Sequence, residues 1–287
     1  MKTFIALINR EFWEQRGVFF SLPMVIGILM VAAAIFGFLL SLGGHAHISF
    51  IDAHIPGHHV SETSITTLFF ISSIPFMIVL WLTVFYYYIG TLYDDRKDNS
   101  ILFWRSLPIS ETQTISSKLI AGNVLAPFCT WVCMMVVQLL LLVIASVFLM
   151  VHPVMPWIDL WRPFTMISTW LHIFELMIVQ GLWLLPLFAW CMLCSSFSKK
   201  APALRAIVPV VLLMMCDLFF VQHHYFIHFI ATRFEGAAQT FGNIISHHHT
   251  ALAMQPLWLP NDISMALGLG VAAVLIVIAG NLRRQAS

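Results

Sequence analysis

Charged residues are scarce in this chain, and their scarcity decides its class. Only 9% of the 287 residues are Asp, Glu, Lys or Arg, whereas 60% are hydrophobic and the mean hydropathy is +0.90. A soluble domain carries about 25% charged residues, so this chain lacks the polar surface that a water-soluble monomer requires. The composition therefore predicts a polytopic membrane protein.

Several catalytic and nucleotide-binding motifs are also missing. No glycine is followed by lysine, which excludes the G-x-x-x-x-G-K-[ST] loop that holds phosphates in many ATPases. Neither the H-E-x-x-H motif of zinc proteases nor the G-x-S-x-G motif of serine hydrolases is present. We therefore expect a subunit that is not an enzyme, with no catalytic residues and no cofactor of its own.

Cysteine is sparse, and all five cysteines lie inside apolar runs. Cys191 and Cys194 have the spacing of a redox or metal pair, but no second pair accompanies them. We interpret them as small apolar residues of a helix interior. An extramembrane disulfide framework is not expected.

Long apolar runs, in contrast, are abundant. A helix needs about 20 apolar residues to cross the bilayer core, and six runs reach or approach that length. They are 18–42, 65–92, 119–151, 164–194, 206–222 and 263–282. The sequence therefore predicts an all-α transmembrane domain over 18–287 with six membrane-spanning helices. Proline occurs in five of the six runs, which predicts kinks that neighbouring helices accommodate.

Residues 1–17 predict an amphipathic helix that lies on the membrane surface before the first span. Apolar residues at helical spacing, such as Ile8 and Phe12, share one side of this helix, and most of the charged residues fall on the other. Gly17 predicts its end. The apolar run that follows is too long for the core of a cleaved signal peptide, so we expect the segment to be retained.

Basic residues are distributed unevenly between alternate loops. Twelve of the 14 Lys and Arg residues fall in the N-terminus, the second loop, the fourth loop and the C-terminus, and only Arg162 and Arg233 fall elsewhere. Because basic residues concentrate on the cytoplasmic side, we expect both termini inside the cell and a multi-pass location in the inner or plasma membrane. The last outward loop, about 223–262, is predicted to contain short helices that dip into the outer leaflet.

The most highly charged block of the chain lies between the second and third runs, on the predicted cytoplasmic side. Ile101, Trp104 and Leu107 recur at every third residue and form a stripe on one helix face. The acidic residues from Asp94 onward would stand at the start of this helix, where the helix dipole favours anions. The block therefore predicts a short cytoplasmic helix over about 95–107. A solvated loop is the alternative interpretation.

The start of the next helix is marked as well. Pro108 ends the short helix, and Ser110 with Gln113 then has the spacing of a capping box. A new helix is therefore predicted to begin after Ser110 and to lead into the third span.

Several residues of this block match one family signature. Asp95-Arg96 matches an acidic-basic pair, Ser106-Leu107-Pro108-Ile109-Ser110 matches a Ser-Leu-Pro-aliphatic-Ser motif, and Lys118 follows Pro108 by ten residues. The block thus resembles the signature of type-2 ABC transporter permeases, the membrane subunits of ABC exporters. Asn99-Ser100 in place of Gly-Thr and Trp104-Arg105 in place of two aliphatic residues depart from that signature. The N-terminal amphipathic helix and the outward loop extend the resemblance over the whole chain.

The resemblance implies a half-transporter that exports an amphipathic or hydrophobic substrate. Two six-span subunits, as a homodimer or a heterodimer, would form the path through the lipid, and no nucleic-acid partner is implied. Two copies of a separate cytoplasmic ATPase would bind ATP and Mg²⁺. Coupling to that ATPase would use Asp95, Arg96, Ile101, Leu102, Trp104, Leu107 and Pro108.

Three ionisable residues fall inside the predicted spans. His172 and Glu175 share one face of the fourth span, and Asp217 lies in the fifth. Charged side chains are costly within a bilayer and usually face a protein interior or a cavity. Each of the three is therefore a candidate either for the substrate path or for an interhelix hydrogen bond.

Histidine is distributed unusually, because none of the 13 histidines falls on the predicted cytoplasmic side. Histidine is a common ligand of zinc, copper and nickel and titrates near neutral pH, so outward metal binding or pH sensing is one interpretation. The other is that these are polar residues tolerated at the membrane interface, and no metal site is assigned. A second function therefore stays open: a membrane-embedded enzyme or metal-handling protein that uses His172, Glu175 and the outward histidines.

Overall fold

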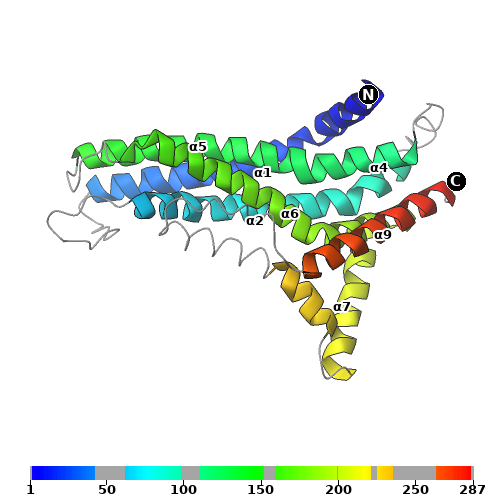
Figure 1. The fold of residues 1–287 in the computed structure, drawn as a ribbon. Helices are drawn as coiled ribbons and strands as arrows, with labels where there is room; N and C mark the ends of the chain where they lie inside the picture. Colours follow the sequence, from blue (N-terminus) through cyan, green and yellow to red (C-terminus); the bar gives the residue numbers. More distant parts are fainter. Residues whose placement is uncertain are drawn as a thin grey trace. The chain divides into compact units, whose positions relative to one another are not determined.

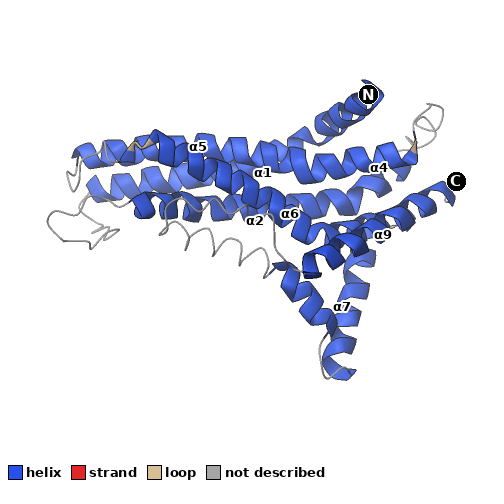
Figure 2. Cartoon of the chain, in the orientation of Figure 1, coloured by secondary structure: helices blue, strands red, loops and turns tan. Residues whose placement is uncertain are grey.

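In the computed structural model, the regular secondary structure of the described residues is helical. It describes residues 2–42, 62–97, 110–151, 160–198, 200–220, 225–234 and 263–285. In those ranges every regular element is a helix (Figures 1 and 2). The prediction of an all-α protein is confirmed for this part of the chain.

The helices are long, and most of them are apolar. They are α1 (Lys2–Leu42), α2 (Glu62–Lys97), α4 (Glu111–Ile120), the π-helix η1 (Ala121–Leu125), α5 (Ala126–Val151), α6 (Pro163–Phe197), α7 (Pro202–Phe220), a helix over 225–234 and α9 (Ile263–Gln285). Six segments are long and apolar enough to cross a membrane: Phe4–Leu42, Thr66–Asp95, Thr112–Val151, Pro163–Phe197, Pro202–Phe219 and Ser264–Arg283. The six predicted spans are confirmed as candidate membrane-spanning helices, which marks the chain as a multi-pass membrane protein.

Helix α1 continues through Gly17, so the predicted end at that residue is wrong. A glycine inside a helix costs only about 1 kcal/mol relative to alanine, and the long apolar sequence that follows favours an unbroken helix. Pro23 also lies within α1. The N-terminal segment and the first span are therefore one helix in sequence.

The chain divides into two compact units. Unit 1 comprises Met1–Arg16, Trp81–Pro127 and Glu175–Ser287, and unit 2 comprises Gly17–Leu80 and Phe128–Phe174. Helices α1, α2, α5 and α6 each contribute residues to both units.

Unit 2 is held together by a buried amide. Gln138 of α5 donates from Nε2 to the Phe69 carbonyl and to Ser72 Oγ of α2, both at 2.9 Å. Its Oε1 accepts the indole N–H of Trp170 of α6 at 2.7 Å, and Trp131 of α5 donates to the Trp170 carbonyl at 2.8 Å. Within a bilayer the hydrophobic effect does not drive helices together, because lipid tails are as apolar as the helix surfaces. Hydrogen bonds of this kind contribute to helix association instead.

Aromatic rings form the centre of unit 1. The ring of Phe188 in α6 lies 5.9 Å from Trp81, 4.9 Å from Phe85 and 5.1 Å from Tyr88, measured between centroids. Such stacked and edge-on pairs add about 0.5–1.5 kcal/mol each beyond the area that they bury. They fix the register of α2 against α6, and with it the position of the polar residues one turn further along α2.

The π-helix η1 lies where Pro127 follows. A proline ring collides with the carbonyl four residues before it, and for Pro127 that residue is Asn123, inside η1. The wider π turn removes this collision. It also lets Asn123 donate to the Tyr88 hydroxyl at 2.9 Å, and residue 122 must be glycine because a Cβ there would lie 2.4 Å from that hydroxyl.

Candidate functional site

The predicted capping box opens α4 and is confirmed. Ser110 Oγ accepts the backbone N–H of Gln113 at 3.2 Å, and Gln113 Oε1 accepts the backbone N–H of Ser110 at 3.3 Å. The two bonds satisfy donors that a helix start leaves without partners. They fix the beginning of α4, and α4 carries Lys118 two turns later.

Lys118 lies within a cluster of four buried charges in unit 1. The charge cluster consists of Glu11 of α1, Asp95 of α2, Lys118 of α4 and Arg283 of α9. Lys118 Nζ is 2.9 Å from Glu11 Oε1 and 3.4 Å from Asp95 Oδ1. Lys118 and Glu11 are each only 2% exposed, so water screens this attraction little.

Asp95 connects three helices through its carboxylate. Arg283 Nη2 donates to Asp95 Oδ2 at 3.3 Å, and the guanidinium of Arg10 lies 4.0 Å from Asp95 Oδ1. Arg10 also forms a 2.6 Å ion pair with Glu14, one turn along α1. The cluster therefore joins the N-terminal part of α1 to the ends of α2 and α9.

Neutral polar groups complete the cluster. Lys118 Nζ donates to Thr91 Oγ1 at 3.0 Å and lies 3.4 Å from the Thr91 carbonyl. The Tyr87 hydroxyl donates to Glu11 Oε2 at 2.9 Å. An ammonium has three protons to donate, and Glu11, Asp95 and Thr91 together accept all three.

Two carboxylates and two cations balance formally in the charge cluster. Removing charges from water is costly, so a buried pair adds little net stability, although loss of one partner costs about 3–5 kcal/mol. Every charged group in the cluster has an opposite charge within 3.4 Å. The cluster is therefore suited to clamping four helices in one arrangement, and not to reacting with a substrate.

The charge cluster lies at the ends of candidate membrane spans. Asp95 and Arg283 are the last residues of the spans Thr66–Asp95 and Ser264–Arg283, and Lys118 lies near the start of Thr112–Val151. Helix α4 packs against α9 beside the cluster. These three spans thus have one end in common.

The placement of Asp95 differs from the sequence prediction. Asp94 and Asp95 lie in the last turns of α2, which runs to Lys97, and do not begin a new helix. A carboxylate is disfavoured at a helix C-terminus, and at Asp95 the cations of Lys118 and Arg283 offset that cost.

The other predicted coupling residues are described only in part. Arg96 belongs to α2, but its side chain lies outside the described part of the chain. The remaining positions lie outside the described residues altogether: Ile101, Leu102, Trp104, Leu107 and Pro108. The charge cluster and the capping box therefore bracket the predicted coupling segment on both sides.

No protein-family model, curated protein or solved structure matches the chain.

Of the three candidate pathway residues, Asp217 has a clear structural role. It is buried on α7, and its Oδ2 accepts the backbone N–H of Ile227 at 2.9 Å. Ile227 lies in the first turn of the helix over 225–234, where backbone donors lack helical partners. Asp217 therefore caps that helix from α7. His172 and Glu175 are half-buried in α6.

Metal binding gains no support from the described residues. Within those ranges no group of three or more His, Cys, Asp or Glu side chains is arranged to hold a metal ion. Of the histidines, His172 and His228 lie in described helices, and His228 is exposed. The others fall outside the described part: His45, His47, His54, His58, His59, His152, His223, His224, His247, His248 and His249.

Arg233, which the sequence predicts only as a charge of an outward loop, is a buried cation. It is 2% exposed, and its guanidinium lies 5.5 Å from the Trp183 ring centroid and 4.5 Å from that of Phe229. It donates to the Ser264 carbonyl at 2.8 Å. Burial lowers the pKa of Arg233. Gly268 leaves room for the guanidinium, since a Cβ there would lie 2.4 Å from it. Arg233 ties the helix over 225–234 to α6 and α9.

Sequence reasoning missed four members or neighbours of the charge cluster. The sequence pattern places Glu11 and Arg283 among the charges of the two terminal segments, and Tyr87 and Thr91 within the apolar run 65–92. A usable signal was present at Thr91, Asp95 and Tyr87, because residues four apart share one face of a helix. A polar face on an otherwise apolar span indicates a polar partner from another helix.

Proposed function

We propose that the chain is the membrane-spanning permease subunit of an ATP-driven ABC exporter, with both termini in the cytoplasm of a cell whose inner or plasma membrane it crosses six times. A separate cytoplasmic ATPase would supply the energy, and two permease subunits would form the path. The substrate class is amphipathic or hydrophobic. Six candidate spans, the signature-like block and the lack of a phosphate-binding loop support this proposal.

The observation that supports it most is the pairing of Asp95 with Lys118. These residues mark the two ends of the signature-like block, and their side chains meet at 3.4 Å in the charge cluster. The residues between them include the predicted stripe of Ile101, Trp104 and Leu107. The segment on which an ATPase would act is thus fastened to the protein at its base.

Mechanical coupling requires that both ends of this segment are firmly attached to the helix bundle. A force on a segment moves a helix bundle only if the segment's attachment to the bundle is stiffer than the contacts that must change. Buried ion pairs and the capping box provide such an attachment, because breaking one buried pair costs about 3–5 kcal/mol. Movement of the segment would therefore be transmitted to α2 and α4 together, and through Arg283 to α9.

The same cluster supports the expected orientation. It joins the N-terminal part of α1, the end of α2, the start of α4 and the end of α9. If these lie at one membrane surface, both termini and the second loop share that surface. With twelve of the 14 basic residues in the N-terminus, the second and fourth loops and the C-terminus, the cytoplasmic surface is the one proposed.

The test is co-purification with an ATPase encoded beside this chain. Trp104→Asp combined with Leu107→Asp places charge on the predicted stripe, so we expect loss of the ATPase from the purified complex and loss of transport. Asn99→Asp combined with Ser106→Asp is the matched control, since it adds the same two charges to the same segment on the side of the predicted helix opposite the stripe. Undiminished co-purification by the double variant, in protein that inserts normally, would overturn the proposal.

A further inference from the structure

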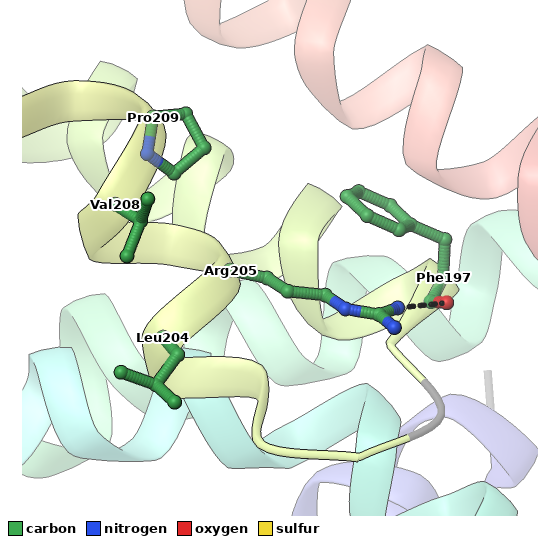
Figure 3. Close-up of a pocket in the computed structure, with 5 residues that line it drawn as sticks. All are labelled: Phe197, Leu204, Arg205, Val208 and Pro209. Atoms are coloured by element: carbon green, nitrogen blue, oxygen red, sulfur yellow. Dashed lines mark hydrogen bonds between the residues drawn. The ribbon is translucent and has the colours of Figure 1, made fainter. Parts of the chain in front are cut away.

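A groove opens where α6 ends and α7 begins. It has a volume of about 340 Å³ and is lined by Phe197, Leu204, Arg205, Val208 and Pro209 (Figure 3). Ligand sites commonly measure about 300–1,000 Å³, so the groove is large enough for part of a ligand. Four of its five lining residues are apolar, and the fifth is a cation.

Arg205 is held at the rim of this groove. Its Nη1 donates to the carbonyl of Phe197 at 3.1 Å, and its guanidinium lies 5.9 Å from the Phe197 ring centroid (Figure 3). Phe197 is the last residue of α6, where helix carbonyls have no helical donor. One guanidinium nitrogen therefore satisfies the helix end while the exposed remainder of the group stays available for an anion.

The level of the groove in the membrane follows from the two spans that border it. The span Pro163–Phe197 ends and the span Pro202–Phe219 begins within a few residues of each other. Their connection therefore lies at a membrane surface, whichever side that is. Lys200, in this connection, is exposed.

The apolar part of the groove runs away from that surface along α7. Leu204 and Val208 are one turn apart on α7 and are 62% and 47% exposed, and Arg205 lies beside them on the same turn. Trp190 of α6 donates to the Ala206 carbonyl at 3.0 Å and joins α7 to α6. Arg205 thus lies nearer the membrane surface than Val208 and Pro209, the apolar lining residues that follow it on α7.

We propose that this groove binds one anionic phospholipid of the surrounding bilayer. The phosphate would contact the guanidinium of Arg205, and one acyl chain would lie along Leu204 and Val208. A free inorganic anion would use only the cation, and a zwitterionic lipid would use the apolar lining without a net charge to match Arg205. The binding does not depend on the exporter function, so either proposal can fail while the other stands.

The experiment measures lipid retention by native mass spectrometry of the purified protein. The probes are dioleoylphosphatidylglycerol, dioleoylphosphatidylcholine and glycerol 3-phosphate, each titrated after delipidation. One basic group near the surface is worth about fivefold in affinity for an anionic lipid, equivalent to about 1 kcal/mol. We expect phosphatidylglycerol to bind at least fivefold more tightly than phosphatidylcholine, and glycerol 3-phosphate to show no specific binding.

Variants assign the binding to the groove. Arg205→Gln is expected to lower phosphatidylglycerol binding to the phosphatidylcholine level, whereas Arg205→Lys retains most of the preference. Val208→Trp fills the groove and is expected to weaken both lipids. Lys97→Gln is the matched control, because it removes an exposed cation at the end of α2.

Four outcomes would overturn the proposal. The first is equal binding of the two lipids. The second is an Arg205→Gln protein that binds phosphatidylglycerol as the parent does, and the third is competition by glycerol 3-phosphate alone. Occupation of the groove by a second copy of the chain would also overturn it, and the same spectra would show this as a dimer that excludes lipid.

Discussion

Replacing Lys118 with methionine should destabilise the protein strongly, because it leaves two carboxylates facing each other without their shared cation. Lys118 Nζ lies 2.9 Å from Glu11 and 3.4 Å from Asp95, and the side chain is 2% exposed. Removing one partner of a buried ion pair costs about 3–5 kcal/mol. Methionine has nearly the length of lysine, so the loss would be electrostatic and not a packing defect.

A second substitution distinguishes this electrostatic loss from a general defect. Glu11→Gln keeps an oxygen that can accept the Tyr87 hydroxyl, now 2.9 Å from Glu11 Oε2, and removes one negative charge. Combined with Lys118→Met it restores the formal balance, leaving Asp95 paired with Arg283. Coupled neighbours deviate from additivity by about 0.5–3 kcal/mol, and we expect the double variant to cost about 2–3 kcal/mol less than the sum of the two single variants.

The assay is reversible unfolding in mixed micelles with increasing SDS, followed by far-ultraviolet circular dichroism. Lys97→Met removes an exposed cation at the end of α2, two residues after Asp95. Its free energy of unfolding should lie within about 0.5 kcal/mol of that of the parent, as surface substitutions usually do. The reasoning fails if Lys118→Met behaves like Lys97→Met. It also fails if the double variant costs the full sum of its parts.

Two further substitutions test other parts of the structure by the same unfolding assay. Gln138→Leu leaves the Trp170 indole N–H, now 2.7 Å from Gln138 Oε1, without its acceptor, so it should cost about 1–3 kcal/mol; a neutral effect would show that the amide does not join α2, α5 and α6. Ala201 has φ of 51°, a left-handed conformation that costs an L-residue about 1–2 kcal/mol. Ala201→Gly should remove this strain, but glycine also gives the unfolded chain more conformational freedom, which lowers stability by about 0.4–1 kcal/mol. We therefore expect a net stabilisation of about 0.5–1 kcal/mol, and destabilisation would contradict this.

Much of the helical architecture could be predicted from the sequence, because apolar runs of bilayer length have few alternatives. The capping box at Ser110 and Gln113 was also predictable, since it depends on two residues three apart. Gly17 misled the prediction because helix propensity is weak, and a local signal cannot show that the same helix continues through it. Local rules therefore succeed where the cause is local.

The charge cluster could not be predicted in the same way. Its members are residues 11, 95, 118 and 283. From the local sequence, each can be explained as a surface or loop charge. Their meaning arises only when three-dimensional packing removes water from all four together. For Arg233 the same holds, since its burial against Trp183 and Phe229 depends on the fold of distant helices.

The charge cluster also gives a reason for ionic side chains at positions where apolar side chains would pack equally well. Buried ion pairs add little net stability compared with apolar replacements, but each accepts only one arrangement of its partners. Sliding α4 by one turn past α2 would move Lys118 by about 5.4 Å and leave its charge, and those of Glu11 and Asp95, without partners. An apolar contact would tolerate such a shift at lower cost. In the proposed exporter, the charge cluster would prevent α2 and α4 from sliding past each other when the ATPase pushes on the 98–109 segment. Helices α2, α4 and α9 would therefore move together as one body.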